Sequence, residues 1–241
     1  MTSKLLFAGF APKNLEPKNT IGAKWLRMLD AIGLEKAVSG KRTAIKMHLG
    51  GGVGFSGIHP YFVRKLVEKV KAAGARQVFV TDGAGAVREA VNRGYTPEVV
   101  GCQILPVSGA GDGYFRTLPI QPAFRTLDHV EIAGEIHDAE ALIDFSHVKG
   151  HGDCGFGGAS KNLSMGAVTG RTRGAIHSLE GGLAWDPEKC TRCDTCVENC
   201  PNGVISFNKE GKFNVFYHNC KFCQHCVLIC PEKAISMVGG C

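Results

Sequence analysis

The sequence predicts an α/β fold: a layered domain with a mixed, partly parallel sheet, followed by a small α+β domain rich in cysteine. Strand-type and helix-type segments alternate through the first part of the chain, which is typical of layered α/β domains. Eight of the 11 cysteines fall in two copies of one pattern within the last 52 residues. A chain of 241 residues can bury the cores of one medium and one small domain. We therefore expect domains at residues 1–180 and 181–241.

The first elements of the larger domain follow from local patterns. A strand is expected over residues 4–10. A helix is expected over residues 19–33, with Asn19 or Thr20 as its N-cap and the final glycine as its stop. The apolar run at residues 42–49 predicts a second strand, which leads into a glycine-rich segment.

The next segment has a strong helical pattern. Residues 59–74 form an amphipathic stretch that Pro60 opens and Gly74 closes. A strand follows at residues 76–82, and then a loop with a short helix at residues 83–94. Further strands are expected within residues 103–108, 114–120, 129–136 and 140–148.

The cysteine pattern indicates iron–sulfur chemistry. Each copy has three cysteines separated by two residues, then a fourth cysteine followed by proline, which is the run that binds cubane clusters in bacterial two-cluster proteins. Zinc sites and a disulfide framework are the weaker alternatives, and disulfides need neither the repeated gap nor the proline. The two copies are Cys190, Cys193, Cys196 and Cys200 with Pro201, and Cys220, Cys223, Cys226 and Cys230 with Pro231.

Residues 182–241 resemble bacterial two-cluster ferredoxins, in which the fourth cysteine of each run serves the other cluster. The resemblance implies two [4Fe-4S] clusters. Their expected ligands are Cys190, Cys193, Cys196 and Cys230 for one cluster, and Cys220, Cys223, Cys226 and Cys200 for the other. Between the runs, two short β-type segments flank Gly211 and predict a hairpin. One-electron transfer, a redox partner protein or small-molecule reductant, and a reducing, cytoplasmic location follow as expectations.

Charge and hydropathy narrow the range of partners. The formal net charge is +6, and two clusters of about −2 each, thiolates included, would reduce it to about +2. No long Lys or Arg run is present, so nucleic-acid binding is not expected. No apolar run reaches the roughly 18–20 residues that span a bilayer, and the N-terminus has no long apolar region of a signal peptide. No membrane association is expected either.

Polar residues gather where the predicted strands end. Lys46 and His48 follow one strand, Asp82 ends the next, and Asp144, Ser146 and His147 end a third. Ligands of open α/β sheets bind beyond the carboxyl ends of the strands, so these ends are candidate site positions. The glycine-rich segment at residues 50–57 matches neither the phosphate loop nor the dinucleotide fingerprint.

The candidate residues fall into two groups by chemistry. Imidazoles exchange protons near neutral pH, and a lysine that is partly buried or close to other cations can become a nucleophile. The candidate catalytic residues are Lys161, His151, His147, His48 and His177. The candidate cofactor-binding residues are Lys46, Asp82, Gly157, Gly158 and Asn162. Each also has a structural alternative, such as a turn or N-cap role for Asp82, and His59 before Pro60 is expected to initiate a helix.

The segments "IKMHLGGG", "VTDG" and "HVKGHGDCGFGGASKNLSMG", with the later His177, resemble the family filed as domain of unknown function 362. Members of that family often carry a two-cluster ferredoxin tail. The spacing of His151, Lys161 and His177 is also similar to the N-terminal domain of nickel-pincer lactate racemases. That second resemblance implies that Lys161 attaches a nicotinic-acid-derived cofactor and that His177 binds a metal. The chain departs from that family in its "TDGAGA" turn and in its cysteine-rich tail.

Three classes of function remain open. The leading one is an iron–sulfur oxidoreductase that passes electrons to a small-molecule substrate or cofactor site in the N-terminal domain. The second is a non-catalytic ferredoxin-type carrier whose α/β domain docks redox partners. The third is an enzyme that handles a further metal or small cofactor in a racemase-like pocket. The sequence predicts neither the substrate nor the oligomeric state.

Overall fold

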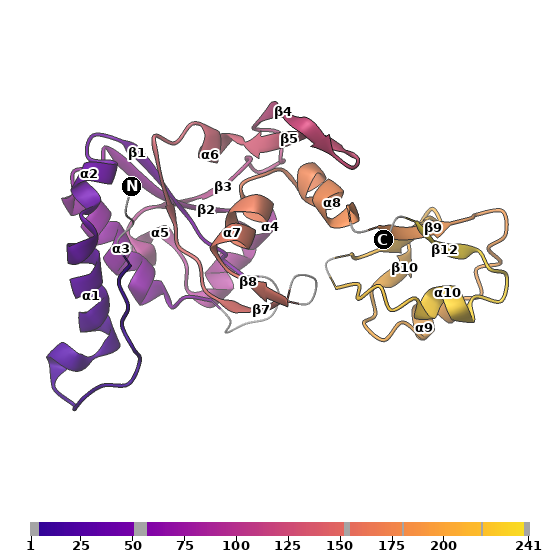
Figure 1. The fold of residues 1–241 in the computed structure, drawn as a ribbon, viewed down its shortest axis with the longest axis horizontal. Coiled ribbons are helices and arrows are strands. Elements are labelled where there is room, and N and C mark those ends of the chain that lie inside the picture. Colours follow the sequence, from indigo (N-terminus) through magenta and orange to yellow (C-terminus); the bar gives the residue numbers. More distant parts are fainter. Residues whose placement is uncertain (1–4, 51–56, 152–154, 180, 218, 239–241) are drawn as a thin grey trace. The chain divides into compact units, whose positions relative to one another are not determined.

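The computed structural model describes residues 5–50, 57–151, 155–179, 181–217 and 219–238. The chain divides into two compact units (Figure 1). The first, here called the sheet unit, comprises Met1–Leu118, Glu131–Val148 and Gly158–Gly170. The second, the cysteine unit, comprises Pro119–Val130, Lys149–Gly157 and Arg171–Cys241. The boundary at residue 180 stays a prediction.

The sheet unit is built on four parallel strands in the order β3-β2-β1-β6. They are β1 (Arg42–Lys46), β2 (Gln77–Asp82), β3 (Gln103–Pro106) and β6 (Ala141–Asp144). The side chains of β1 and β2 are almost all buried, as in parallel sheets covered on both faces. With the small antiparallel sheets described below, this confirms the predicted α/β class.

The strand order creates a topological switch. The chain runs outward from β1 to β2 and β3, and then returns to the other side of β1 to form β6. The strands that follow β1 in the chain thus lie on one side of it, and β6 lies on the other. Ligands of open α/β sheets bind at such a point, beyond the carboxyl ends of the two strands.

Helix α3 (Pro60–Ala72) supplies much of the core. Its buried residues Val63, Leu66, Val67 and Val70 follow helical spacing and form one apolar face. They join the residues of β1 and β2 in one hydrophobic cluster. Each fully buried aliphatic side chain of this kind contributes roughly 1.5–3 kcal/mol.

Helix boundaries follow the expected caps. The Thr20 side chain accepts a hydrogen bond from Ala23 N at the start of α1 (Ile21–Ile32), and Gly33 ends that helix with φ 75°. At α3, His59 Nδ1 accepts a hydrogen bond from Tyr61 N, so the helix-initiating role expected for His59 is confirmed. The sheet unit's other helical and hairpin elements are η1 (Pro17–Asn19), α2 (Leu34–Val38), α4 (Ala84–Ala90), η2 (Val91–Arg93), α5 (Pro97–Val100), β4 (Phe115–Phe124), β5 (Leu127–Ala133), α6 (Gly134–His137) and α7 (Ala159–Gly166), with β4 and β5 extending into the second unit.

Two expectations about strands were wrong. Residues 5–10 form no strand, and Leu5 and Phe7 are more than 90% exposed (92% and 91%), because no described strand pairs with this segment. The strand expected over residues 140–148 ends at Asp144. The segment after it forms an antiparallel hairpin of β7 (Lys149–His151) and β8 (Gly155–Gly157), which belongs to the cysteine unit.

The cysteine-rich part of the second unit is an interlocked repeat. Positions of its first half recur 30 residues later: β9 (Gly182–Trp185), α9 (Thr195–Glu198) and β10 (Ile205–Phe207) correspond to β11 (Phe213–Val215), α10 (His225–Ile229) and β12 (Ile235–Val238). Strand β9 pairs with β12, and β10 pairs with β11 around the expected Gly211 turn. Each of these two-stranded sheets therefore combines one strand from each half. Helix α8 (Gly170–Ser178) precedes them.

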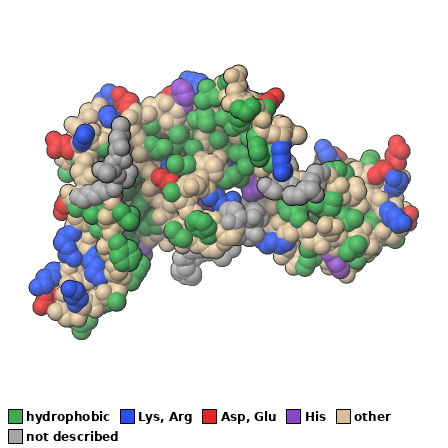
Figure 2. Space-filling view, viewed as in Figure 1, with side chains coloured by type: hydrophobic (Ala, Val, Ile, Leu, Met, Phe, Trp, Pro, Cys, Tyr) green, Lys and Arg blue, Asp and Glu red, His purple; other side chains and the backbone are tan. Residues whose placement is uncertain are grey.

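Surface properties agree with the composition. On the face shown in Figure 2, Lys and Arg side chains lie in separate groups with hydrophobic side chains between them. No helix within the described ranges is long and apolar enough to cross a bilayer.

Candidate functional site

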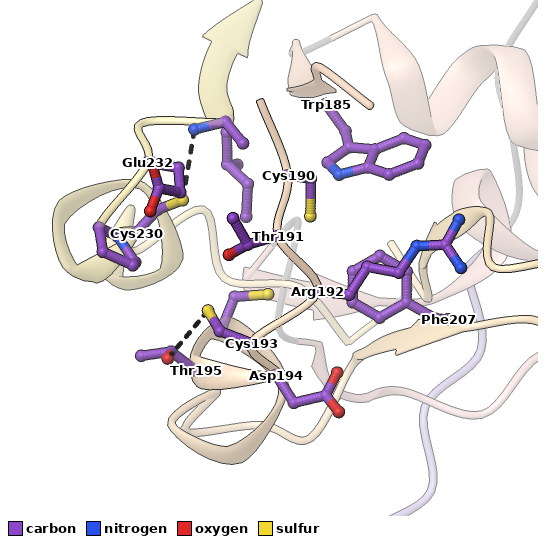
Figure 3. A pocket seen from close by; sticks show the side chains of 14 residues that line it. Trp185, Cys190, Thr191, Arg192, Cys193, Asp194, Thr195, Phe207, Cys230 and Glu232 are labelled. Carbon is purple, nitrogen blue, oxygen red and sulfur yellow. Dashed lines mark hydrogen bonds between the residues drawn. The ribbon is translucent and has the colours of Figure 1, made fainter. Parts of the chain in front are cut away.

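A hollow in the cysteine unit is bordered by four cysteines from both runs (Figure 3). Three belong to the first run, in the loop before α9 and at its start, and the fourth lies at the end of α10 in the second run. They are Cys190, Cys193, Cys196 and Cys230. This is the set expected for one cluster when the fourth ligand crosses between runs. Among the described residues, no three His, Cys, Asp or Glu side chains are grouped so as to hold a single metal ion.

The loops between these cysteines have an unusual backbone. Arg192 and Asp194 have φ 55°, and the corresponding Phe222 and Gln224 have φ 49° and 59°, all in the left-handed region. For residues other than glycine, this conformation costs roughly 1–3 kcal/mol each and persists where the surroundings require it. Alternating right- and left-handed residues turn successive N–H groups towards one point, which is a backbone arrangement that surrounds many Fe–S sites.

The fourth cysteine of each run accepts a backbone hydrogen bond. Val204 N donates to Cys200 Sγ at 3.5 Å, and Ala234 N donates to Cys230 Sγ at 3.3 Å. The two contacts are related by the 30-residue repeat. Bonds of this kind stabilise negative charge on sulfur, and both fourth cysteines accept one.

Burial and mutual repulsion oppose bare thiolates at Cys196 and Cys226. Burial raises the pKa of Cys196 to about 11, and the nearby Cys190, Cys226 and Cys230 sulfurs add to the shift. Burial also raises the pKa of Cys226, with Cys220 and Cys223 contributing. A group that supplies positive charge to these sulfurs, as the iron of a cluster does, removes this repulsion. The donors therefore fit iron–sulfur ligation.

An apolar shell surrounds the cysteines. Val204, Ile205 and Ile235 are only 4–6% exposed and pack with Cys196, Cys220 and Cys226. Exclusion of water is one of the factors that set cluster potentials. His218 lies outside the described residues, and His225 begins α10.

A second polar site lies at the switch point of the sheet unit. Lys46 at the end of β1 is 1% exposed, and its ammonium group donates to Asp82 Oδ1 at 2.9 Å, Asn162 Oδ1 at 2.7 Å and the Met47 carbonyl at 2.9 Å. Asp82 Oδ2 accepts a further bond from Leu49 N at 2.8 Å. Lys46 thus connects the ends of β1 and β2 with helix α7.

Asn162 joins the two strands that flank the switch. Its amide nitrogen donates to the Lys46 carbonyl at 3.0 Å and to Asp144 Oδ1 at 2.8 Å. Lys46 and Asp144 are direct neighbours in the parallel register of β1 and β6. Ser146 also donates to Asp144 Oδ1. Helix α7, which packs against both strands, is therefore fixed across the switch point (Figure 1).

Asp82 is held as a carboxylate. Burial alone would raise its pKa, but the hydrogen bond from His48, the charge of Lys46 and the N–H of Leu49 outweigh burial and lower the pKa to about 2. The distance from His48 Nδ1 to Asp82 Oδ2 is 3.4 Å. The His48 ring stacks on His147, with 5.9 Å between centroids and 7° between planes. A carboxylate thus orients one of two parallel imidazoles at the strand ends.

The structure brings together five of the ten N-terminal candidates: Lys46, His48, Asp82, His147 and Asn162. Lys161 precedes Asn162 on α7 and is half-buried, and no contact of its side chain with this network is found among the described residues. Gly157 ends β8, Gly158 precedes α7, and His151 and His177 belong to the cysteine unit.

Two contributors to the site were given no role by sequence reasoning. Asp144 was noted only as a strand end, although its position opposite Lys46 makes it the anchor of Asn162. Gly166 lies so close to Lys46 that a Cβ there would be 2.5 Å from Lys46 Nζ. No short sequence pattern indicates either role, because both depend on how α7 packs against β1 and β6. Cys154 and Cys241 lie outside the described residues, and Cys102 is buried with its pKa raised to about 11 by burial.

Comparisons with known proteins match both parts of the chain. A family model described as "Domain of unknown function (DUF362)" matches residues 43–225. The C-terminal region is similar to the pyruvate synthase subunit PorD of Methanocaldococcus jannaschii, at 42% identity over 53 residues, covering 22% of this chain and 62% of that protein. It is also similar to the ferredoxin-type protein NapF of Escherichia coli K12, at 34% identity over 77 residues, covering 30% of this chain and 47% of NapF.

A ferredoxin of Pyrobaculum islandicum is similar over 51 residues at 37% identity, covering 21% of this chain and 48% of that ferredoxin. The chain therefore spans 47–62% of the length of these three curated relatives. The cysteine unit contains a ferredoxin-type iron–sulfur module. The similarity to lactate racemases stays a prediction.

Proposed function

The chain belongs to the family described as domain of unknown function DUF362, and on that premise we propose that it is an iron–sulfur oxidoreductase. It takes electrons from a redox partner protein or small-molecule reductant and delivers them to a small-molecule or cofactor site in its N-terminal domain. In this proposal the domain of residues 1–180 holds that site, and the domain of residues 181–241 carries the electrons. A reducing compartment such as the cytoplasm fits eight thiolates kept for cluster binding.

The observation that supports the electron-transfer half most strongly is the hollow shared by Cys190, Cys193, Cys196 and Cys230. We assign these cysteines to one [4Fe-4S] cluster, and Cys220, Cys223, Cys226 and Cys200 to a second. When bound, such clusters supply one-electron transfer. The chain's own residues hold the sulfurs, donate N–H groups to Cys200 and Cys230, and exclude water through Val204, Ile205 and Ile235.

The acceptor half rests on the polar network at the switch point. Reduction of a small organic substrate consumes protons as well as electrons, and an imidazole can supply a proton near neutral pH. Asp82 accepts the Nδ1 hydrogen of His48 and so leaves its Nε2 for exchange with a substrate. We assign His48 and His147 to proton transfer, and we assign Lys161, which precedes Asn162 on α7, to substrate or cofactor attachment. Lys46, with three partners, holds the site together.

A second candidate function is a non-catalytic electron carrier whose sheet unit docks redox partners. It is favoured by the relatives, because two of those described here bear names of ferredoxins or ferredoxin-type proteins. The two functions differ in what they require of the sheet unit. A carrier needs its surface, whereas an oxidoreductase needs His48 and Lys161.

Two measurements on anaerobically purified protein test the proposal. Iron and acid-labile sulfide should each be present at about eight per chain, and a content near one or two irons without sulfide would refute the cluster assignment. Intact-mass spectrometry then addresses Lys161. An adduct that is lost in Lys161→Arg supports the attachment role, whereas an unmodified wild-type lysine removes the covalent, racemase-like version of it.

Variants at the switch point distinguish the oxidoreductase from the non-catalytic carrier. His48→Gln and Lys161→Ala should leave iron content and cluster reduction by dithionite unchanged. Each variant is then expressed in a strain from which the gene has been deleted, and rescue of the growth defect is compared with rescue by the wild-type protein. If both variants rescue growth fully, the sheet unit has no catalytic role and the carrier function holds. Loss of complementation with intact clusters supports the oxidoreductase.

A further inference from the structure

The indole nitrogen of Trp185 is buried and has no hydrogen-bond partner among the described residues. An unsatisfied buried donor costs roughly 1–3 kcal/mol and therefore calls for an explanation, such as an ion or group that is bound there. Trp185 ends strand β9, where Ile235 of β12 is its partner in the antiparallel register. Its position is thus set by the strand pairing that interlocks the two halves of the repeat.

The ring is also fixed from its sides. It stacks on Phe213, with 5.9 Å between centroids and 18° between planes, and meets Phe207 edge to face at 6.0 Å. These aromatic contacts leave the indole little freedom to turn its N–H towards water. The orientation of the indole N–H is therefore fixed by the packing of the cysteine unit.

The same ring borders the hollow that holds Cys190, Cys193, Cys196 and Cys230. Figure 3 shows the indole nitrogen on the side of the ring that faces Cys190, while the carboxylates of Asp194 and Glu232 lie on other sides of the hollow. In this view Cys190 is thus the labelled side chain on the same side as the indole nitrogen. Hydrogen bonds to thiolate or inorganic sulfur stabilise the more negative, reduced state of a cluster and so raise its potential.

The second half of the repeat lacks this donor. The residue 30 positions after Trp185 is Val215, at the end of β11, whose side chain has no N–H. We propose that Trp185 donates a hydrogen bond to a sulfur of the cluster held by Cys190, Cys193, Cys196 and Cys230, and selectively raises the reduction potential of that cluster. The bond makes the two clusters unequal and biases the electron towards this one. The inference rests on the proposed cluster assignment.

The first test detects the bond without changing Trp185. The chain has two tryptophans, so Trp25→Phe leaves Trp185 as the only one. This variant is grown with ¹⁵N-indole-labelled tryptophan, reduced anaerobically and measured by pulsed EPR. A ¹⁵N hyperfine coupling to the reduced cluster, together with a proton coupling that disappears in D₂O, is expected. A reduced-cluster signal without either coupling overturns the inference and leaves the proposed function standing.

The second test measures potentials. In Trp185→Phe, which keeps an aromatic ring but lacks the N–H, one of the two cluster potentials should fall and the other should stay. We expect about a tenfold change in the equilibrium constant for reduction, or about 59 mV for a one-electron couple. The matched variant Val215→Ile should move neither potential by a comparable amount. Equal shifts of both clusters, or no shift in Trp185→Phe with full iron content, would contradict a selective hydrogen bond. Absence of any reducible cluster in wild-type protein would instead refute the proposed function.

Discussion

Replacement of Asp82 by asparagine tests whether the buried network at the switch point stabilises the sheet unit. The substitution keeps the size of the side chain and removes its charge. It leaves the ammonium group of Lys46, which is 1% exposed, without a described carboxylate partner, so that its described acceptors are all uncharged. The backbone N–H of Leu49 and the His48 ring lose a charged acceptor as well.

The expected magnitude follows from two observations. The lowering of the Asp82 pKa from its ordinary 3.8 to about 2 corresponds to about 2 kcal/mol at neutral pH. Removing one member of a buried ion pair typically costs about 3–5 kcal/mol, because the other charge remains buried. We therefore expect Asp82→Asn to lower the free energy of unfolding of the sheet unit by about 3 kcal/mol at pH 7.

The sign of the pH dependence is fixed by the direction of the shift. Because the folded pKa is lower than the unfolded one, the stabilisation is present above about pH 4 and is lost as the pH falls towards 2. The difference between wild type and Asp82→Asn should therefore shrink to roughly half at pH 3, since asparagine resembles the protonated acid.

Trp25 provides the assay. It stacks on Phe145 at 5.3 Å within the sheet unit, and in a Trp185→Phe background it is the sole tryptophan. Urea unfolding followed by its fluorescence reports this unit alone. Asp30→Asn is the control, because Asp30 pairs with Lys69 while its side chain is 59% exposed, and exposed pairs contribute little. Equal losses in the two variants, or a gap that does not shrink in acid, would refute the reasoning.

Three further predictions follow from the same contacts. Gly166→Ala should destabilise the sheet unit by about 1–3 kcal/mol in the Trp25 assay, because its Cβ would overlap Lys46. Gly85→Ala, with open space at its Cβ, should not destabilise the unit, and equal effects of the two variants would contradict the close packing at Gly166. Asn162→Ala should cost about 2–3 kcal/mol by urea unfolding, while Lys161→Ala on the same helix leaves stability unchanged; the reverse order would mean that Lys161 is the structural residue. Lys233→Gly should raise the midpoint temperature at which the cluster absorbance is lost, because glycine adopts φ 49° without the strain of about 1 kcal/mol that lysine carries there. Gly203→Ala, at φ 58° in the corresponding turn, should lower that temperature, and unchanged midpoints would show that these turns relax freely.

The sequence indicates the iron–sulfur module, and the assignment of single cysteines to each cluster stays a prediction. Eight sulfurs at fixed spacing, with proline after the fourth, have few chemical uses. Cys230 of the second run lines the same hollow as Cys190, Cys193 and Cys196, as crossed ligation would require. The donor from Trp185 had no such signal, because it depends on the pairing of β9 with β12 and on the ring contacts of Phe207 and Phe213.

The switch-point network could be predicted only in part. Polar residues after buried strands indicated Lys46, His48 and Asp82, and their meeting follows from the parallel sheet. The structural role of Lys46 could not be predicted, because the sequence alone indicates a cation that could bind a ligand. Its bond to Asn162 depends on how α7 packs against the sheet. The strand expected over residues 4–10 does not form at residues 5–10 for a related reason: β-type composition forms a strand only when another strand is available to pair with it.

Crossed ligation is the central claim, and the iron content of two double variants tests it most directly. If Cys190 and Cys230 bind the same cluster, Cys190→Ser with Cys230→Ser damages one cluster and should retain about four irons per chain. Cys190→Ser with Cys200→Ser then damages both clusters and should retain almost none. If each run instead binds its own cluster, the two results are exchanged, with about four irons remaining in the Cys190 and Cys200 variant. That outcome would contradict the account.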